Sequence, residues 1–413
     1  MRALDTKSST AGAAGAVYHS RLGAVSAPGR GRPTSTSEWL TLQATELTDS
    51  PLADTDPTPG GKSAVTPPIP PPGLRVEYLA LPEHAPLPKG PGSDELLAAV
   101  YFGSRAQVDL GTSGALGIQV RLDPLLNVAT EVPMELWWAQ GPVSHGQTGA
   151  IRHAHDAHHL FAVIELDERQ HGGIERAAAL AYSSMRQFQQ QSAFPHLLRI
   201  WNYMDAINEG SGDLERYRHF CVGRASGMGH SVADRYPAAT AIGQQRDTHL
   251  LQVYWLAGRW PGTQIENPRQ VSAYRYPRAH GPVSPSFARA TFSPDGTLLV
   301  SGTASIVGHA SRHDDDCIAQ LDETLRNLST LKSHADTAVQ AHLSTATAPA
   351  NTKGLFKVYV RDATHAAHIA ERLRQNPPQY FDPSDVIYLA ADICRRELLL
   401  EIECVRIPVG SPV

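Results

Sequence analysis

One order of predicted strands and helices occurs twice along this chain, and it constrains the fold more than any other feature. Runs rich in β-branched and aromatic residues predict the strands, and apolar residues at helical spacing predict the helices. In the first copy the strands are predicted at 159–165, 197–203, 238–243 and 249–256, with helices at 174–190 and from Asp213 onward. In the second copy the strands are predicted at 297–301, 355–361, 386–390 and 397–405, with helices at 315–333 and 363–375. Two copies of such a unit of strands and helices imply an α+β protein of two similar domains packed against each other.

Three further strands are predicted before the first copy, at 96–102, 116–122 and 134–138. The predicted helices have one apolar face each, for example at Ile174, Ala178, Ala181, Met185 and Phe188. We therefore expect each domain to be a mixed β-sheet with its helices on one face. The natural place for a binding site is then the crevice between the domains or between subunits.

Composition argues against several classes of partner. The chain has 413 residues, with 36 Lys and Arg against 41 Asp and Glu. It therefore lacks the excess of basic residues that is typical of nucleic-acid-binding proteins. No apolar run is long enough to span a membrane, and the first residues lack the apolar segment of a secretory signal. The four cysteines form no Cys-x-x-Cys pair. We therefore expect a cytoplasmic protein with free thiols.

Residues 1–74 differ in composition from the rest, because they are rich in Ser, Thr, Ala, Gly and Pro and end in a proline-rich run at 67–72. Such a segment cannot bury enough apolar surface to fold alone, so we predict a disordered arm. The remainder divides between the two copies. We predict an N-terminal domain over 75–265 and a C-terminal domain over 266–413.

The last predicted strand places acidic side chains within an apolar run. Glu401 and Glu403 alternate with Leu400 and Ile402, and Cys394 lies seven residues before Glu401. A buried carboxylate is costly unless it is paired or functional. Residues i and i+2 share a face of a strand, so either glutamate can be the functional acid. A thiol and a carboxyl group near one cleft indicate chemistry, although a salt-bridged Glu and a buried apolar Cys are the structural alternatives.

The C-terminal copy resembles the RidA/YjgF family in the segments 296–302, 320–328, 357–362 and 400–403. That family consists of small chorismate-mutase-like α+β domains that form trimers with sites between subunits. The last segment, Leu400-Glu-Ile-Glu403, lies where the family has its acidic strand. The resemblance implies that this chain consists of two fused RidA/YjgF-like domains.

The whole chain from residue 75 onward resembles the chorismatases. The resemblance rests on long, irregular segments at 199–209, 215–224, 236–243, 268–277, 281–290 and 301–309. It implies a soluble enzyme that needs no cofactor or metal, acts on chorismate and is a monomer or a small homo-oligomer. Chorismate is a dianion, and Arg provides a bidentate partner for each carboxylate.

The resemblance also implies the residues of the site. The substrate-binding candidates come from motifs in both halves of the chain: Arg216, Tyr217, Arg224, Tyr274, Ala304 and Arg361. Which of Arg216, Arg218 and Arg224 faces the ligand stays open. Cleavage of the enolpyruvyl ether requires protonation of a methylene carbon, and a carboxyl group with a raised pKa suits this step. We assign that role to Glu401, with Glu403 as the alternative.

Cys394 bears on the product. In the family, members without this cysteine hydrolyse chorismate to a dihydrodiol, and members with it form 3-hydroxybenzoate. The combination of this cysteine with Ala304 in one chain resembles the bifunctional subtype of xanthomonadin-type pigment producers. That subtype yields pyruvate with 3- and 4-hydroxybenzoate, precursors of an aryl-polyene pigment and ubiquinone. The alternatives are a chorismatase with a single product, an imine hydrolase of the RidA type and a non-catalytic ligand-binding module.

The histidine-rich segment His153-Ala-His-Asp-Ala-His-His159 resembles a metal cluster. A closed metal site needs about four ligands with supporting hydrogen bonds. The segment precedes a predicted strand of the first domain, away from the residues above. We therefore expect no metal.

Overall fold

The computed structural model describes residues 72–408, apart from 91, 107, 111–114, 129, 230–234, 246, 343–351 and 379–380. The predicted arm of residues 1–74 lies outside the described residues, except for its last three positions. The helices of the described part are α1 (Ile174–Gln191), α2 (Arg216–Met228), α3 (Cys317–His342) and α4 (Ala366–Gln375).

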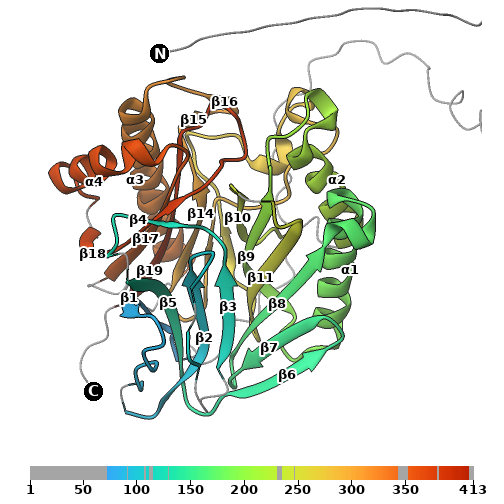
Figure 1. The fold of residues 1–413 in the computed structure, drawn as a ribbon, viewed down its shortest axis with the longest axis vertical. Coiled ribbons are helices and arrows are strands. Elements are labelled where there is room, and N and C mark those ends of the chain that lie inside the picture. The colour runs from blue at the N-terminus through green and yellow to red at the C-terminus, as the bar shows by residue number, and fades with distance from the viewer. Residues whose placement is uncertain are drawn as a thin grey trace, which may run out of the picture. The chain divides into compact units, whose positions relative to one another are not determined.

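The strands form three large sheets and one small pair (Figure 1). The four-stranded sheet has the order β1-β5-β2-β3, built from β1 (Arg75–Pro82), β2 (Asp94–Phe102), β3 (Leu116–Val120) and β5 (Glu131–Gln140). The six-stranded sheet has the order β10-β9-β11-β8-β7-β6, built from β6 (Ser144–Thr148), β7 (Ile151–His155), β8 (His159–Asp167), β9 (His196–Asp205), β10 (Ala238–Gln244) and β11 (Leu250–Gly258).

The seven-stranded sheet has the order β12-β13-β14-β19-β17-β18-β4. Its strands are β4 (Pro124–Leu125), β12 (Thr263–Ile265), β13 (Ala290–Phe292), β14 (Leu298–Thr303), β17 (Thr352–Val360), β18 (Phe381–Ala390) and β19 (Leu400–Pro408). The small pair is β15 (Ile306–Val307) with β16 (Ala310–Ser311). All strands and helices predicted for the two copies are present.

The two larger sheets share one strand topology, as the repeat predicts. β9 is parallel to β10, and β11 is antiparallel to both β9 and β8. In the same way β17 is parallel to β18, and β19 is antiparallel to both β17 and β14. The orders β10-β9-β11-β8 and β18-β17-β19-β14 therefore correspond strand by strand.

The same order occurs a third time in the four-stranded sheet, which the sequence did not reveal. β2 is parallel to β3, and β5 is antiparallel to both β2 and β1. The described residues between these strands form no helix. The reason for the omission is physical: helical periodicity gave the strongest evidence for the other two copies, and this sheet offers none.

The three sheets share one apolar core. Buried residues of all three form a single cluster, and the other face of each sheet is covered separately. α1 and α2 cover the six-stranded sheet, and α3 and α4 cover the seven-stranded sheet. Connecting segments cover the four-stranded sheet. In Figure 1 the two helix pairs accordingly lie on opposite sides of the strands.

Two glycines set the close packing of α2 on α1. A Cβ atom at Gly223 would overlap the carbonyl oxygen of Glu175, and one at Gly227 would overlap that of Ala179. Glycine weakens a helix interior by about 1 kcal/mol relative to alanine. Here that cost is offset by close contact between the helices, which fixes the position of the side chains that α2 carries.

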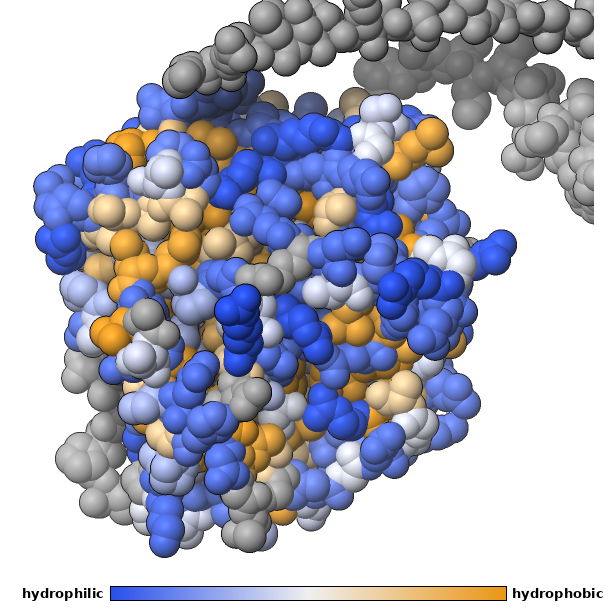
Figure 2. All heavy atoms as spheres, in the orientation of Figure 1, coloured by the Kyte–Doolittle hydropathy of each residue, from blue (hydrophilic) through white to orange (hydrophobic). Residues whose placement is uncertain are grey.

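The surface is mainly hydrophilic on the face drawn in Figure 2, where hydrophobic residues lie in separate groups between polar ones. Among the described residues, the large hydrophobic side chains that are clearly exposed are dispersed along the chain: Leu126, Val128, Leu180 and Leu214. None of the described helices is long and apolar enough to cross a membrane.

Candidate active site

A cavity lies where β10 of the six-stranded sheet meets β14 of the seven-stranded sheet. The amide of Ala239 donates to Ser301 Oγ at 2.9 Å, and the amide of Gly302 donates to Thr240 Oγ1 at 3.0 Å. These bonds join β10, at the edge of its sheet, to the end of β14. The cavity thus lies between the two copies of the repeat, in the kind of crevice that the sequence predicts.

Five of the eight predicted site residues line this cavity. Tyr217 and Arg224 come from α2, Ala304 follows β14, Cys394 lies in the loop before β19, and Glu401 lies on β19. The segments are distant in sequence, so the fold alone brings them together.

Glu401 is a buried carboxyl group without a partner. Its residue is 5% exposed, and within the described residues its carboxyl group makes no hydrogen bond or ion pair. Burial raises the pKa of Glu401 to about 8, and the negative charge of Glu403 adds to the shift. The carboxyl group is therefore mostly protonated near neutral pH and can donate a proton.

Gly302 makes room for this carboxyl group. A Cβ atom at position 302 would overlap Glu401 Oε1, so any other residue would displace the carboxyl group. The backbone of β14 thereby approaches the acid directly.

Glu403, two residues further along β19, has the opposite environment. Its carboxylate accepts hydrogen bonds from Trp201 Nε1 at 2.9 Å and from Thr240 Oγ1 at 2.6 Å. Lys357 Nζ lies 2.6 Å and Arg199 Nη2 lies 2.7 Å from its oxygens. Burial alone would raise the pKa of Glu403, but the charges of Lys357 and Arg199 hold it below its ordinary value. This pairing leaves Glu401 as the free acid of the strand.

The partners of Glu403 connect all three sheets. Lys357 on β17 also lies 2.6 Å from Glu135 Oε2 on β5, while Arg199 belongs to β9. Lys357 and Glu135 are completely buried. Buried charges of this kind require near-complete pairing, and the two cations and two carboxylates balance here.

Two buried guanidinium groups in the cavity have no carboxylate partner. Arg224 is 3% exposed and donates to the Ser286 carbonyl oxygen at 2.7 Å. Arg289 is 4% exposed and donates to Tyr276 Oη at 2.7 Å and to a backbone carbonyl. The Nε–H group of each is buried without an acceptor. Among the described residues neither arginine forms an ion pair, so the cavity holds two uncompensated positive charges suited to an anionic ligand.

Cys394 lies beside Glu401 as a neutral thiol. Burial raises its pKa well above the ordinary value, and the charge of Glu401 adds to this effect. Burial likewise raises the pKa of Tyr217, which lies close to both groups. A thiol of high pKa is a poor nucleophile, so this geometry favours a role for Cys394 in shaping the cavity or in hydrogen bonding.

The cavity is narrow, with a free volume of about 50 Å³. Ligand sites of drug-sized molecules are typically several hundred Å³ in volume. Arg395 and Tyr276 both line the cavity. The guanidinium carbon of Arg395 lies 5.3 Å from the ring centroid of Tyr276, and Arg395 donates a hydrogen bond to the His309 carbonyl oxygen. Entry of a ring with two carboxylates therefore requires side chains such as Arg395 to move.

Comparisons with known proteins agree on one family. Residues 135–257 match the family model described as chorismatase FkbO/Hyg5-like, N-terminal. The 3-hydroxybenzoate synthase of Streptomyces hygroscopicus is 35% identical over 281 residues, which cover 65% of this chain and 80% of that protein. This chain belongs to the chorismatase family.

Other chorismatases support the assignment. The chorismatase of Streptomyces rapamycinicus is 36% identical over 282 residues, again 65% of this chain and 80% of the relative. A crystal structure of a chorismatase superposes with a TM-score of 0.66 at 28% identity, covering 81% of this chain and 98% of that one. The predicted membership in the family is confirmed. The bifunctional subtype and the RidA/YjgF-like nature of the two units stay predictions.

Three predicted binding residues lie outside this cavity. Arg216, at the start of α2, donates to Glu168 Oε1 at 2.6 Å and to the Asp205 carbonyl oxygen. Tyr274 stacks on Tyr236, with ring centroids 4.8 Å apart. Neither residue lines the cavity that holds Glu401.

Arg361, the third, holds the loop that carries Cys394. It donates to Asp392 Oδ1 at 2.8 Å and to the carbonyl oxygens of Ile393, Arg395 and Leu398. This arginine therefore acts on the site through the loop, and a contact with the substrate is not needed to explain it.

Sequence reasoning missed Arg289, Arg395, Tyr276 and Thr240 as cavity residues. Arg289 and Thr240 fall inside segments that carry the chorismatase resemblance, 281–290 and 236–243, and Arg395 follows Cys394 directly. Membership in these segments was the available signal, but nothing in the sequence says which arginines lack a counter-ion.

Proposed function

We propose that this protein removes the enolpyruvyl group of chorismate as pyruvate and leaves a hydroxybenzoate. The observation that carries the proposal is the pair of buried, unpaired guanidinium groups, Arg224 and Arg289, beside the protonated carboxyl group of Glu401. The two carboxylates of chorismate would supply the missing negative charges. Relatives named 3-hydroxybenzoate synthase and chorismatase support the same substrate class.

Glu401 is the proposed general acid. Its proton goes to the methylene carbon of the enolpyruvyl group, which leaves an oxocarbenium-like centre at the ether carbon. For a hydroxybenzoate product, the ring hydroxyl oxygen then attacks a ring carbon as the ether C–O bond breaks. Pyruvate departs and the ring hydroxyl group loses its proton, which leaves an epoxide. One C–O bond of the epoxide then breaks, its oxygen takes up a proton, and loss of a ring proton makes the ring aromatic. Chorismate equals hydroxybenzoate plus pyruvate in atoms, so no water is consumed.

Cys394 and Ala304 are proposed to set the outcome. A neutral thiol beside the acid occupies space that water would need, which favours attack by the ring hydroxyl group. The pairing of this cysteine with alanine supports a mixture of 3- and 4-hydroxybenzoate. A use of these products for an aryl-polyene pigment and ubiquinone is part of the same proposal.

The test is incubation of the purified protein with chorismate, followed by chromatographic separation of the products and a pyruvate assay. The control is Glu401→Gln, which keeps the shape of the side chain without its acid proton. Pyruvate with both hydroxybenzoates, lost in the control, is the expected result. A dihydrodiol alone would contradict the role given to Cys394, and the absence of any turnover would contradict the proposed function.

A further inference from the structure

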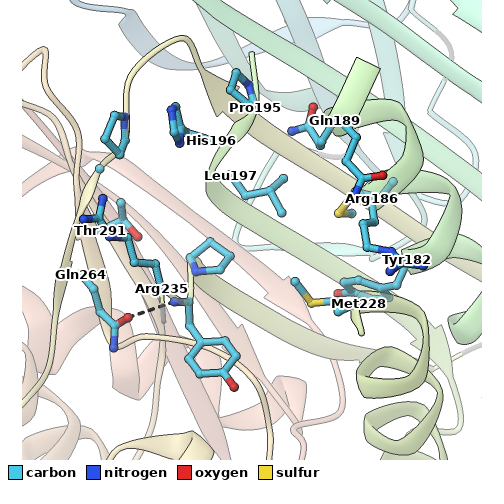
Figure 3. A pocket seen from close by; sticks show the side chains of 16 residues that line it. Tyr182, Arg186, Gln189, Pro195, His196, Leu197, Met228, Arg235, Gln264 and Thr291 are labelled. Carbon is cyan, nitrogen blue, oxygen red and sulfur yellow. Dashed lines mark hydrogen bonds between the residues drawn. The ribbon is translucent and has the colours of Figure 1, made fainter. Parts of the chain in front are cut away.

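A second cavity lies apart from the catalytic one and has a volume of about 360 Å³. Its walls come from the C-terminal half of α1, the start of β9, the end of α2, the residues before β10 and the segment around β12 and β13. Figure 3 shows Arg186 and Gln189 of α1 on one side and Gln264 and Thr291 on the other. The two cavities share no lining residue.

Gln189 is the most unusual residue of this cavity. It is 5% exposed, and neither its Oε1 nor its Nε2 atom has a hydrogen-bond partner among the described residues. Leaving a buried amide unsatisfied is costly, and such groups in native proteins call for an explanation. A ligand hydroxyl group would satisfy both atoms, because it donates one hydrogen bond and accepts another.

The cavity carries positive charge at its rim. Arg186 and Arg235 are exposed, and within the described residues neither forms an ion pair. His196 also lines the cavity, and none of the described residues that line it is a carboxylate. Arg186 lies three residues before Gln189 on α1, so the two side chains share one face of the helix. An anionic group at the rim and a hydroxyl group in the interior would both find partners.

Apart from the polar side chains of Gln190, Gln264 and Thr291, the remaining walls are mainly apolar and suit a flat ring. Met185, Leu197 and Met228 line the interior, together with three prolines, Pro195, Pro237 and Pro261. Small-molecule sites typically combine such walls with a few polar groups that fix the orientation of the ligand. The volume falls within the range of such sites, roughly 300 to 1,000 Å³.

We propose that this cavity is a second ligand site, for a hydroxylated aromatic monocarboxylate. The ring lies between the methionine, leucine and proline side chains, the carboxylate meets Arg186 and Arg235, and the hydroxyl group meets Gln189. The enzyme's own product has this chemistry, and that link rests on the proposed function. Binding itself does not depend on it.

The site is placed to affect catalysis. The ring of Tyr182 forms part of its wall and lies 5.1 Å from the guanidinium carbon of Arg224, which lines the catalytic cavity. Met228 lies one helical turn beyond Arg224 on α2. A bound ring would therefore contact the element that positions a substrate-binding arginine, as a product-sensing site requires.

Calorimetric titration of the full chain with 3-hydroxybenzoate tests the proposal, because it needs no turnover. We expect two equivalents to bind to the unaltered protein. Gln189→Leu should weaken one of them at least tenfold and leave the kcat and KM of chorismate turnover unchanged. The matched control is Gln187→Leu, an exposed position of the same helix that does not line the cavity.

A single equivalent whose affinity is the same in Gln189→Leu and Gln187→Leu would overturn the proposal. Two equivalents with no turnover of chorismate would support this site and refute the proposed function instead. Gln189→Leu removes an unsatisfied buried amide, so the variant is expected to fold. Its thermal unfolding temperature should equal or exceed that of the control.

Discussion

Glu401 and Glu403 occupy neighbouring positions on one face of β19, and both are buried, yet their surroundings differ in every other respect. Glu403 has two cations and two hydrogen-bond donors around it, whereas Glu401 has none in contact. The pKa of Glu403 is accordingly lowered and that of Glu401 is raised. Burial alone thus does not decide the charge of a carboxyl group. The partners decide it, and one strand can supply a structural anion and a proton donor together.

The strongest test of this difference is Glu401→Gln. General acids contribute roughly 10²- to 10⁴-fold to rates, so kcat for chorismate should fall by about 10³-fold. Glu371→Gln, the same change at an exposed position of α4, should leave kcat unchanged. Product assays under saturating chorismate measure both. A Glu401→Gln enzyme with near-normal kcat would mean that Glu403 or another group supplies the proton.

Lys357→Met tests the paired environment of Glu403. This change leaves Glu135 and Glu403 buried without their shared cation, which should lower the free energy of unfolding by about 3–5 kcal/mol. Arg374→Met, which removes an ion pair with Glu371 that is exposed on both sides, should cost less than about 1 kcal/mol. Urea unfolding monitored by tryptophan fluorescence compares the two. Equal stabilities would show that the buried ion group is dispensable.

The cost of an unpaired acid should appear in the pH dependence of stability. The pKa of Glu401 is about 8 in the folded protein and 4.5 in the unfolded chain. The protonated carboxyl group therefore contributes fully to the free energy of unfolding below pH 4.5, and this contribution is lost as pH rises through 8. Relative to Glu401→Gln, the unaltered protein should lose about 1.4 kcal/mol per pH unit within this window. Denaturant unfolding of both proteins at pH 5, 7 and 9 measures the difference. A constant difference would refute the raised pKa.

The unpaired cations across the cavity from Glu401 offer a smaller perturbation. Arg289→Gln removes a charge-assisted contact with a substrate carboxylate, so the KM for chorismate should rise roughly 10- to 100-fold. Arg278→Gln, at an exposed arginine paired with Asp213, serves as the control. Steady-state kinetics separates the effects on KM and kcat. A fall in kcat alone would indicate that Arg289 acts on the transition state and not on binding.

The smallest effect is expected from pH itself. Because the protonated form of Glu401 is the proposed donor, kcat should be nearly constant below pH 8 and fall about tenfold per pH unit well above it. A profile of kcat against pH from 6 to 10 measures this fall. A rate that instead rises through pH 8 would identify Glu401 as a base.

Much of the fold could be predicted from the sequence, because both helix-containing copies have strong periodicity. The helices at 174–190 and 315–333 and the strands around them lie close to their predicted places. The four-stranded sheet escaped prediction as a third copy, because parallel pairing of β2 with β3 without a helix between them leaves no periodic signal.

The sequence identified those site residues whose polarity is unusual for the residues around them. Glu401 and Cys394 stood out because an acid and a thiol neighbour an apolar run. The arginines are not unusual for their sequence surroundings. The sequence therefore did not distinguish Arg224, which has no counter-ion among the described residues, from Arg216, which pairs with Glu168. Pairing is a property of the folded chain and depends on segments far apart in sequence.

The ion group around Lys357 has a consequence for how this protein can be divided. A cut between residues 265 and 266 would leave Lys357 and Glu403 in one piece and Glu135 and Arg199 in the other. Lys357 and Glu403 would stay paired in the second piece, whereas Glu135 and Arg199 in the first piece would each lose an ion-pair partner, and both pieces would expose apolar surface of the shared core. We therefore expect the two halves to be insoluble when made separately and to regain solubility only when made together. The strand order repeats from sheet to sheet, but the unit that we expect to fold is the whole set of three sheets.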